Sequence, residues 1–445
     1  MNLRLPARSL TLVASLVASA FLAGCAAPAA DYLAPPVTGV SSDTRLTDRA
    51  HEEVTRDLIA ITAHSLELRV ALAASIEAAK AENPDPETNP VQSLEAYWDY
   101  IDWAAKAMPW SILPGVEKRH PKLYDRIDQS LNYFYYLNDR PLKMYEGRGL
   151  YRPTVQYAEP YRSWLISFTT RWGEFLNTTG SWSDANLAVA REDARFRLDT
   201  GDYEDPKNWK TFNQFFARYL ADPSKRPIAS PEDDSVLTSP ADSTPQGIWR
   251  IDEKSNIVPR KENEADLRIK SGVFSSVSAL LEGSEYADAF AGGTLTHTFL
   301  DVYDYHRYHF PVSGTVREVV VIPGDDAVGG WIEWDPKEGR YLLEADTPGW
   351  QMIETRAAVI VETESHGLVA ILPIAMSQVS SVCFEDTVKP GAKVKKGDML
   401  GTFLFGGSDI VMIFQKGVSF ELAGKPDAEG GYPHIFMGEH FGTLR

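Results

Sequence analysis

The chain has 445 residues, of which 44% are hydrophobic, and its 62 acidic and 44 basic side chains give a formal net charge of −18. This acidic balance argues against binding to nucleic acid and against electrostatic adhesion to an anionic membrane surface. A chain of this length exceeds one typical domain and can bury more than one core, so we expect two domains.

Residues 1–24 have the pattern of an export signal. Arg4 and Arg8 precede an apolar run over residues 10–22, which leads into a Leu-Ala-Gly-Cys sequence ending at Cys25. The pattern is typical of a lipoprotein signal peptide that is removed before the cysteine, whose sulfur then carries a diacylglyceryl group. A transmembrane anchor is the alternative, but the apolar run is shorter than the ~20 residues that a spanning helix needs.

We therefore expect lipidation at Cys25, which would anchor the protein in the cell envelope on the periplasmic side. Ala26 stands where Asp would mark retention in the inner membrane, and this suggests the outer membrane. Cys383 is the other cysteine of the chain. Because acylation of Cys25 would leave no cysteine to pair with it, we expect Cys383 to be a packed core thiol.

Residues 25–46 are rich in Ala, Pro, Ser and Thr and are expected to form a solvated tether. Residues 47–205 then carry the signals of a helical domain. Apolar residues recur at helical spacing over residues 57–82, and the Asn-Pro-Asp-Pro sequence at 83–86 ends the pattern. Two further helices are expected over residues 93–107 and 123–137, with aromatic side chains that pack a core.

Residues 206–445 are expected to form a β-rich domain. After Pro240 the sequence contains short β-prone runs separated by Gly, Pro and Asp turns. Examples are residues 294–302, 315–322, 357–362 and 367–373. Residues 388–405 resemble the hairpin of lipoyl- and biotinyl-type hybrid barrels, which also occurs in periplasmic adaptor proteins. The predicted fold class is α+β, with a helical N-terminal region before a β-rich domain of hybrid-barrel character.

Two short motifs in this domain contain reactive side chains. Gly406-Gly407-Ser408-Asp409 lies between apolar runs at 402–405 and 410–414, where a Gly-Gly pair by itself indicates a hairpin turn. The second motif, at residues 304–311, places His306 and His309 three residues apart. This spacing also suits a metal, but no Cys or Glu-rich set nearby completes a zinc site, so no metal is predicted.

Together with Ser239-Pro240-Ala241-Asp242, these motifs resemble the phosphatidylserine decarboxylase family. The family has Pro-Ala-Asp, then Asp-Tyr-His-Arg-x-His, then a Gly-Ser cleavage site, and this chain has the same order. Residues 215–218, Arg226-Pro227 and the stretch 269–293 match as well, so the resemblance covers about residues 210–440. The N-terminal extension is similar to that of the branch that contains L-tryptophan decarboxylases.

The resemblance implies a zymogen that cuts itself between Gly407 and Ser408. His309 would act as the base that activates the Ser408 hydroxyl, and Asp242 would orient and stabilise the imidazole. Attack on the preceding carbonyl gives an ester, and elimination followed by hydrolysis leaves a pyruvoyl group derived from Ser408. The pyruvoyl group would begin a small chain, residues 408–445, that stays associated with the large chain.

Two further roles follow from the resemblance. The pyruvoyl carbonyl condenses with a substrate amine and accepts the electrons released as CO₂ departs. His306 would assist decarboxylation or reprotonate the α-carbon. Asp304 would help to hold the two histidines, although it is equally typical of a turn or cap residue.

The chain also departs from the family pattern in two places. Asp409 stands where many relatives have Thr, and a carboxylate there could slow oxyanion formation or hold a substrate amine. Ser243 follows Asp242 where Gly is usual.

The resemblance leaves the substrate open. Phosphatidylserine, converted to phosphatidylethanolamine in phospholipid biosynthesis, is the first expectation. A free L-amino acid, including an aromatic one, is the alternative that the helical extension favours. A hypothesis of another class is a non-catalytic periplasmic adaptor lipoprotein.

Overall fold

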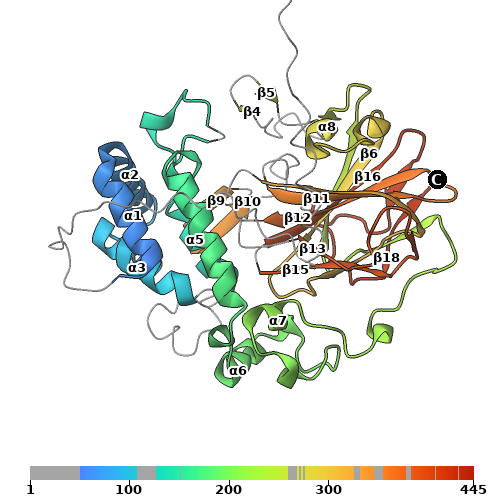
Figure 1. Ribbon diagram of the computed structural model, residues 1–445, viewed down its shortest axis with the longest axis horizontal. Coiled ribbons are helices and arrows are strands. Elements are labelled where there is room, and N and C mark those ends of the chain that lie inside the picture. The colour runs from blue at the N-terminus through green and yellow to red at the C-terminus, as the bar shows by residue number, and fades with distance from the viewer. Residues whose placement is uncertain are drawn as a thin grey trace, which may run out of the picture.

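The computed structural model describes residues 51–107, 127–150, 152–258, 268–269, 272–273, 276–324, 331–344, 354–376, 382–405, 407–428 and 430–445. The expected signal peptide, tether and lipidation site lie outside these residues. Helices gather on one side of the molecule and sheets on the other (Figure 1). The α+β class is confirmed, and no closed barrel is found among the described strands.

The N-terminal region is helical, as expected. Its longer helices are α1 (Glu53–His64), α2 (Leu66–Glu82), α3 (Leu94–Ala107), α4 (Ile127–Tyr136), α5 (Tyr161–Leu176) and α6 (Asp184–Glu192). Short 3-10 turns connect them at η4 (Lys143–Tyr145), η5 (Val155–Tyr157), η6 (Thr179–Ser181) and η7 (Ala194–Phe196). The helices bury a core rich in Tyr, Trp and Phe.

The single helix expected over residues 57–82 is wrong, because α1 and α2 are separate and meet at an angle of 114°. Ser65 has an extended backbone between them, and its Oγ accepts a hydrogen bond from the Leu68 backbone N–H at 3.2 Å, which caps α2. Among the described residues no single helix is long and apolar enough to cross a membrane, and this bent pair passes that test only when taken together.

A connecting stretch joins the two regions. It contains η8 (Pro206–Asn208), α7 (Phe212–Phe216) and η9 (Pro223–Lys225). Beyond it, an eight-stranded sheet has the order β14-β8-β11-β12-β16-β6-β2-β3. Its strands are β2 (Thr244–Ile251), β3 (Ile257–Val258), β6 (Thr294–Leu300), β8 (Gly314–Ile322), β11 (Thr355–Glu362), β12 (Leu368–Met376), β14 (Lys393–Val394) and β16 (Gly407–Phe414).

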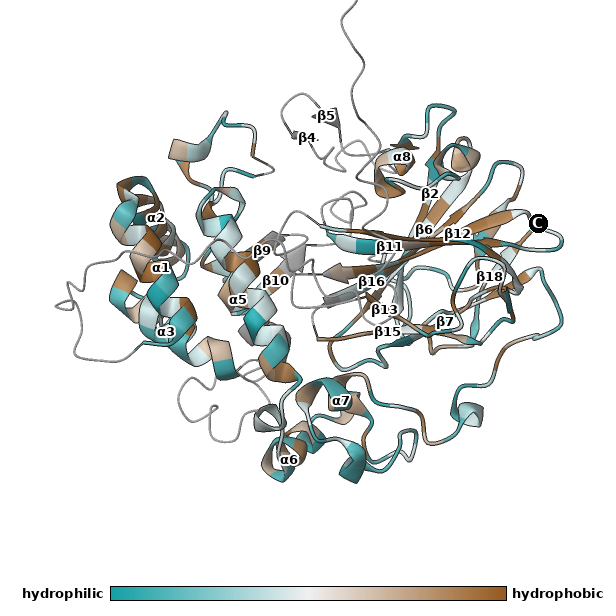
Figure 2. Ribbon diagram, in the orientation of Figure 1, coloured by the Kyte–Doolittle hydropathy of each residue, from teal (hydrophilic) through white to brown (hydrophobic). Residues whose placement is uncertain are grey.

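Smaller sheets complete the β-rich region. Their strands are β1 (Val236–Thr238), β17 (Phe420–Leu422) and β18 (His440–Leu444) in one sheet, β7 (Arg307–His309), β13 (Val382–Phe384) and β15 (Met399–Phe403) in another, and the two-stranded pairs β4 (Arg268–Ile269) with β5 (Gly272–Val273) and β9 (Trp331–Asp335) with β10 (Arg340–Glu344). The short helices α8 (Val277–Leu280) and η10 (Ala287–Phe290) lie beside the large sheet. Hydrophobic residues run along β12 (Figure 2).

The central strands β11, β12 and β16 of the large sheet are buried on both faces, which is why they are nearly continuous apolar runs. One face packs with the β7–β15 and β18 side, in a core that includes Leu300, Tyr308 and Ile410. The other packs under α8, in a core that includes Trp249 and Val411. Successive residues of β16 therefore enter different cores.

Two expectations about chain pairing are corrected. The segment resembling a hybrid-barrel hairpin contributes β14 to the large sheet and β15 to a three-stranded sheet, and these strands pair with β8, β7 and β13 instead of with each other. The strands on either side of the Gly-Gly sequence do not form a hairpin either, because β15 and β16 lie in different sheets. Cys383 is buried, as expected.

The β9–β10 hairpin attaches the β-rich region to the helices. Tyr341 on β10 packs against Tyr133 and Tyr136 of α4, with ring centroids 5.4 and 4.6 Å apart. Its hydroxyl donates to the Thr88 carbonyl at 2.8 Å and accepts from the Asn83 side chain at 2.8 Å. A buried hydroxyl satisfied in this way favours one relative placement of the two regions.

Candidate active site

Three distant segments meet at one end of the large sheet. Ser408 on β16 lies opposite Leu300, the last residue of β6, and the chain continues from there into the motif at residues 304–309. The His306 carbonyl accepts a hydrogen bond from the Phe403 backbone at 2.9 Å, shortly before Ser408. The His309 backbone donates to the Pro240 carbonyl at 2.8 Å, which brings in the third segment.

Ser408 is completely buried, and its hydroxyl makes no hydrogen bond to any described residue. A buried polar group without a partner costs roughly 1–3 kcal/mol and calls for an explanation. The same buried setting excludes bulk water from the bond between Gly407 and Ser408.

His309 is held as a neutral imidazole. Its Nδ1 lies 2.8 Å from the Gly397 carbonyl, which can only accept, so Nδ1 carries the proton and Nε2 is the basic nitrogen. Nε2 lies 3.3 Å from the Tyr305 hydroxyl. Burial lowers the pKa of His309 to about 4, although the hydrogen bond to Gly397 and the charge of Asp242 oppose the shift.

The Gly397 carbonyl is positioned by an unusual backbone. Gly397 has a φ of +88°, and a Cβ there would lie 2.5 Å from the Ile228 side chain. Its backbone N–H also donates to the Phe310 carbonyl at 2.8 Å. Glycine is therefore required at this position to orient the imidazole.

His306 also carries its proton on Nδ1, and its side chain is completely buried. Its Nδ1 donates to the Asp304 carbonyl at 3.0 Å, while Nε2 makes no hydrogen bond to a described residue. The ring stacks on Phe216 with centroids 3.8 Å apart. Burial, with a smaller contribution from the Arg218 charge, lowers the pKa of His306 to about 3, so the imidazole holds no second proton to donate near neutral pH.

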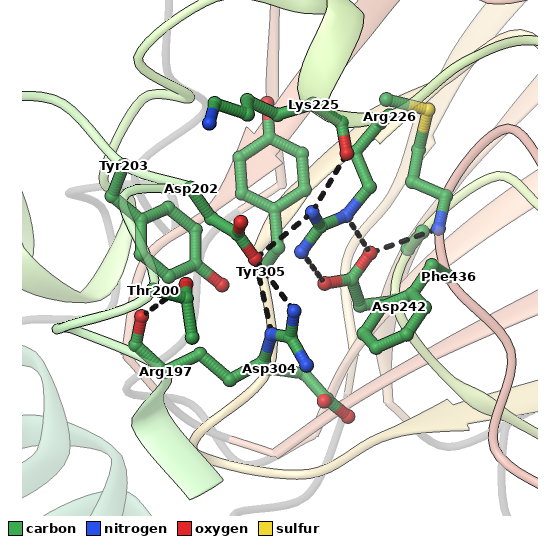
Figure 3. A network of polar contacts seen from close by, with 12 residues as sticks. Arg197, Thr200, Asp202, Tyr203, Lys225, Arg226, Asp242, Asp304, Tyr305 and Phe436 are labelled. Carbon is green, nitrogen blue, oxygen red and sulfur yellow. Dashed lines mark hydrogen bonds and ion pairs between the residues drawn. The ribbon is translucent and has the colours of Figure 1, made fainter. Parts of the chain in front are cut away.

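Asp242 is the centre of a buried polar network (Figure 3). Its carboxylate accepts from Arg226 at 2.9 and 2.7 Å and from the Met437 backbone at 2.8 Å. Arg226 also reaches Asp202, which Arg197 binds from the helical side. The pairing with Asp242 outweighs burial and raises the pKa of Arg226.

The expected hydrogen bond from Asp242 to His309 is not among those of the described residues. The Gly397 carbonyl orients the imidazole instead, and Asp242 acts on His309 through its charge. Ser243, which replaces the usual Gly, accepts from the Thr298 hydroxyl at 2.7 Å and exchanges backbone hydrogen bonds with Ile435 at 2.9 Å. Its side chain is thus accommodated in this segment.

Asp304 combines the two roles considered for it. Its backbone carbonyl holds His306, whereas its carboxylate accepts from the Asp301 backbone at 2.9 Å and pairs with His434 at 2.9 Å. Burial raises the pKa of Asp304, and His434 opposes that shift. Burial alone would lower the pKa of His434, but its pairing with Asp304 prevails and raises it.

An aromatic cluster holds the residue three positions before Ser408. The Phe405 ring makes edge contacts with Trp172 of α5 at 5.3 Å and with Phe212 and Phe216 of α7 at 5.1 Å each. The Phe405 backbone N–H donates to the Asn213 side chain at 3.1 Å. Since Phe216 also stacks on His306, the cluster connects the helical region with the predicted cleavage site.

Sequence reasoning missed several residues of this site. Arg218 and Arg226 fall within matched segments but received no role, although buried arginines are rare enough to be a signal. Arg218 is completely buried and donates to the carbonyls of Tyr303 and Asp304 at 2.7 and 3.2 Å. Tyr305 and His434 carried no separate signal, because their roles depend on contacts across the fold.

Comparisons with known proteins agree with the matched segments. A family model described as phosphatidylserine decarboxylase matches residues 212–443. Phosphatidylserine decarboxylase proenzyme 2 of Oryza sativa subsp. japonica is 34% identical over 221 residues, which cover 49% of this chain and 32% of that protein. Decarboxylase iboD of Amanita muscaria is 31% identical over 270 residues, covering 57% of this chain and 74% of iboD.

A third relative is bacterial. Phosphatidylserine decarboxylase proenzyme of Vibrio campbellii is 28% identical over 255 residues, covering 52% of this chain and 81% of that protein. The matched part thus spans about a third of the rice protein but most of the other two.

Proposed function

Because this chain belongs to the phosphatidylserine decarboxylase family, a family of carboxy-lyases, we propose that it is a proenzyme that cuts itself between Gly407 and Ser408 and then removes CO₂ from phosphatidylserine to give phosphatidylethanolamine. The observation that carries the proposal is the buried, unbonded Ser408 hydroxyl at the sheet end where His306 and His309 lie.

Self-cleavage needs a base, a nucleophile and a dry site. The neutral His309 presents Nε2 as a base, and its low pKa keeps that nitrogen unprotonated near pH 7. Removal of the Ser408 proton allows Oγ to attack the Gly407 carbonyl carbon, and the peptide C–N bond breaks as the ester C–O bond forms. Loss of the Ser408 α-proton then expels the Gly407 carboxylate, and hydrolysis of the dehydrated residue releases ammonia.

The residues around Ser408 fit the pyruvoyl group that this sequence of steps would leave. The position is buried, so the methyl group that the Ser408 Cβ would become and the keto oxygen that would replace the Ser408 nitrogen would both be shielded from bulk water. When present, the group supplies the electron sink for decarboxylation. His306 would offer Nε2 as a hydrogen-bond acceptor or base, and the network around Asp242 and Asp304 would supply charge beside the substrate.

The two chains formed by the cut are expected to remain together. β16 lies between β12 and β6, which both belong to the large chain. β18 pairs with β1, also of the large chain. Of the β16 pairings, only Gly407 with Met376 lies on the large-chain side of the cut; those from Ser408 to Phe414 would still join the small chain to β12 and β6 and support continued association.

Intact mass spectrometry of the wild type beside Ser408→Ala and Ser419→Ala tests the proposal. The wild type and the Ser419 control are expected to give a small chain of residues 408–445 with a blocked, pyruvoyl-mass end. Ser408→Ala is expected to stay whole and inactive. A single uncut chain in the wild type would overturn the proposal and revive the adaptor hypothesis, against which membership of a carboxy-lyase family otherwise argues.

A free L-amino acid is the second candidate substrate. It is favoured by the packing of Trp172, from the helical region, onto Phe405, three residues before the cut, because the resemblance links that helical extension to a branch acting on free amino acids. The similar protein iboD is named a decarboxylase without mention of a phospholipid. Assays of released CO₂ with phosphatidylserine micelles and with free L-tryptophan would decide between the two. Release from the micelles alone would support the phospholipid, and release from L-tryptophan alone would support the free amino acid.

We also propose that Cys25 carries the lipid anchor. The thioether to the diacylglyceryl group and a disulfide to Cys383 would use the same Cys25 sulfur, since the chain has only two cysteines. Mass spectrometry of the Cys25 peptide from membranes distinguishes them. A diacylglyceryl modification that Cys25→Ala abolishes would support the anchor, whereas an unlipidated Cys25 linked to Cys383 would refute it.

A further inference from the structure

A second buried pair lies beside Ser408 and takes no part in the steps above. The His297 Nδ1 lies 3.1 and 3.3 Å from the two carboxylate oxygens of Asp409, and both side chains are almost completely buried. Asp409 lies opposite Phe299, and Val411 lies opposite His297. Asp409 and His297 are therefore diagonal neighbours on adjacent strands, within reach of each other on one face of the sheet.

That face is not the face of Ser408. Leu300 and Ala375, which lie opposite Ser408, belong to the core on the β7–β15 side. Val411, two residues after Asp409, belongs to the core under α8. Because side chains alternate along a strand, the Asp409 carboxylate points away from the Ser408 hydroxyl. The two roles considered for it, on the oxyanion or on a substrate amine, are therefore not supported.

Burying Asp409 and His297 in the core of a sheet costs free energy. A buried pair of polar side chains must recover the free energy of removing both groups from water, and apolar residues of the same volume avoid that cost. The His297 ring stacks on Trp249 with centroids 4.9 Å apart, and its Nε2 makes no hydrogen bond to a described residue. Stability of the intact chain is thus a weak reason for an acid and a histidine at these positions.

Cleavage at Ser408 would place Asp409 and His297 in different chains. Before the cut, Asp409 is tethered through Ser408 to Gly407, whereas afterwards it is the second residue of the small chain. His297 stays in the large chain on β6. The pair then joins the two chains one residue from the reactive carbonyl, at a new terminus, where strands tend to fray.

We propose that Asp409 and His297 are positioning residues that hold the pyruvoyl end of the small chain in register after cleavage. The inference rests on the proposed self-cleavage. The contact would join Asp409, the second residue of the small chain, to His297 on β6, which lies two residues before Phe299, the cross-strand neighbour of Asp409.

Asp409→Asn and His297→Gln test the inference by hydrogen–deuterium exchange. In the cut enzyme, each variant is expected to exchange the backbone amides at the start of β16 at least about tenfold faster than the wild type. On the uncut Ser408→Ala background, the same changes should have much less effect, because the covalent bond to Gly407 still holds the strand. A merely structural role would raise exchange equally in both backgrounds.

Turnover gives the second readout. Both variants should be cut completely, yet kcat, measured as CO₂ released from phosphatidylserine micelles or L-tryptophan, should fall roughly 10- to 100-fold with little change in KM, because the reactive group is misplaced. The double variant should lower kcat by a smaller factor than the product of the two single factors, because both changes break the same contact. Glu253→Gln is the matched control, since the Lys416–Glu253 pair also joins the two chains but is exposed at the other end of β16.

The outcomes separate the two proposals. An uncut wild type would refute self-cleavage itself. A cut wild type with Asp409 and His297 variants of normal kcat and exchange would refute only the positioning role. Folded variants that are not cut would also overturn it, because they would place the pair in the cleavage step.

Discussion

The helical region and the β-rich region bury their side chains for different purposes. In the β-rich region, His306 and His309 are fixed by backbone carbonyls of Asp304 and Gly397, so their chemistry depends on backbone geometry. In the helical region, aromatic side chains dominate, and Trp172 reaches the cleavage segment by packing alone. Reactive groups are thus held by directional hydrogen bonds, while the covering region contributes non-directional packing.

This difference implies that substitutions in the two regions should fail in different ways. Changes to the reactive groups should alter rates with modest loss of stability. Changes to the packing should lower stability first and alter rates through the position of Phe405. Arg226 lies where the regions meet, since it binds both Asp202 and Asp242.

The largest effects are expected for the two histidines. His309→Gln should slow self-cleavage by about 10²- to 10⁴-fold, because it removes the base. His306→Gln should leave cleavage intact and lower decarboxylation by a similar factor. Time courses by mass spectrometry, followed by CO₂ assays, measure both, with the exposed His440→Gln as control. An uncut His306 variant would show that the two roles are not divided in this way.

Arg226→Met should cause a large loss of stability. Arg226 and Asp242 are both buried, and removing one partner of a buried pair costs about 3–5 kcal/mol because the other charge is left unpaired. Denaturant unfolding of both proteins on the uncut Ser408→Ala background measures the loss. Arg317→Met, which breaks an exposed pair with Glu362, should cost at most about 1 kcal/mol. If Arg226→Met and Arg317→Met lowered the free energy of unfolding equally, the buried pair of Arg226 with Asp242 would stabilise the protein no more than an exposed pair does.

Phe405→Ala is expected to affect both stability and rate. Truncating a buried phenylalanine costs roughly 3–5 kcal/mol, and here it also frees the segment that precedes the cut. Phe414→Ala is the matched control, since Phe414 is equally buried and stacks on Phe420 at 4.7 Å, away from the helical region. Both variants should lose stability, but only Phe405→Ala should slow cleavage. If both variants are cut at the same rate, the packing of the helical region on Phe405 does not position the segment before the cut.

The smallest effect concerns pH. The folded pKa of His434 lies above its ordinary value of 6.5, so its stabilising contribution is present below pH 6.5 and is lost as the pH rises through the folded pKa. Because the imidazole is about a third exposed, the effect should not exceed about 1 kcal/mol. His434→Gln should flatten this part of the stability curve, measured by unfolding between pH 6 and about pH 9. An unchanged slope would exclude the His434–Asp304 pair as its source.

The sequence by itself determined the α+β class, the strands around residues 294–302, 315–322 and 357–362, and the order of the three motifs. Strand periodicity and motif order are local or linear properties, so they can be read without a fold. The helix break at Ser65 could not be read, because the residues on both sides are good helix formers.

Only the tertiary structure decided how the site residues are partnered. Asp242 binds Arg226 instead of His309, a glycine carbonyl orients His309, and Asp409 faces the core opposite Ser408. These partners lie up to 112 residues apart, as for His297 and Asp409. Their meeting depends on sheet register, where a shift of one residue would exchange the faces of Ser408 and Asp409.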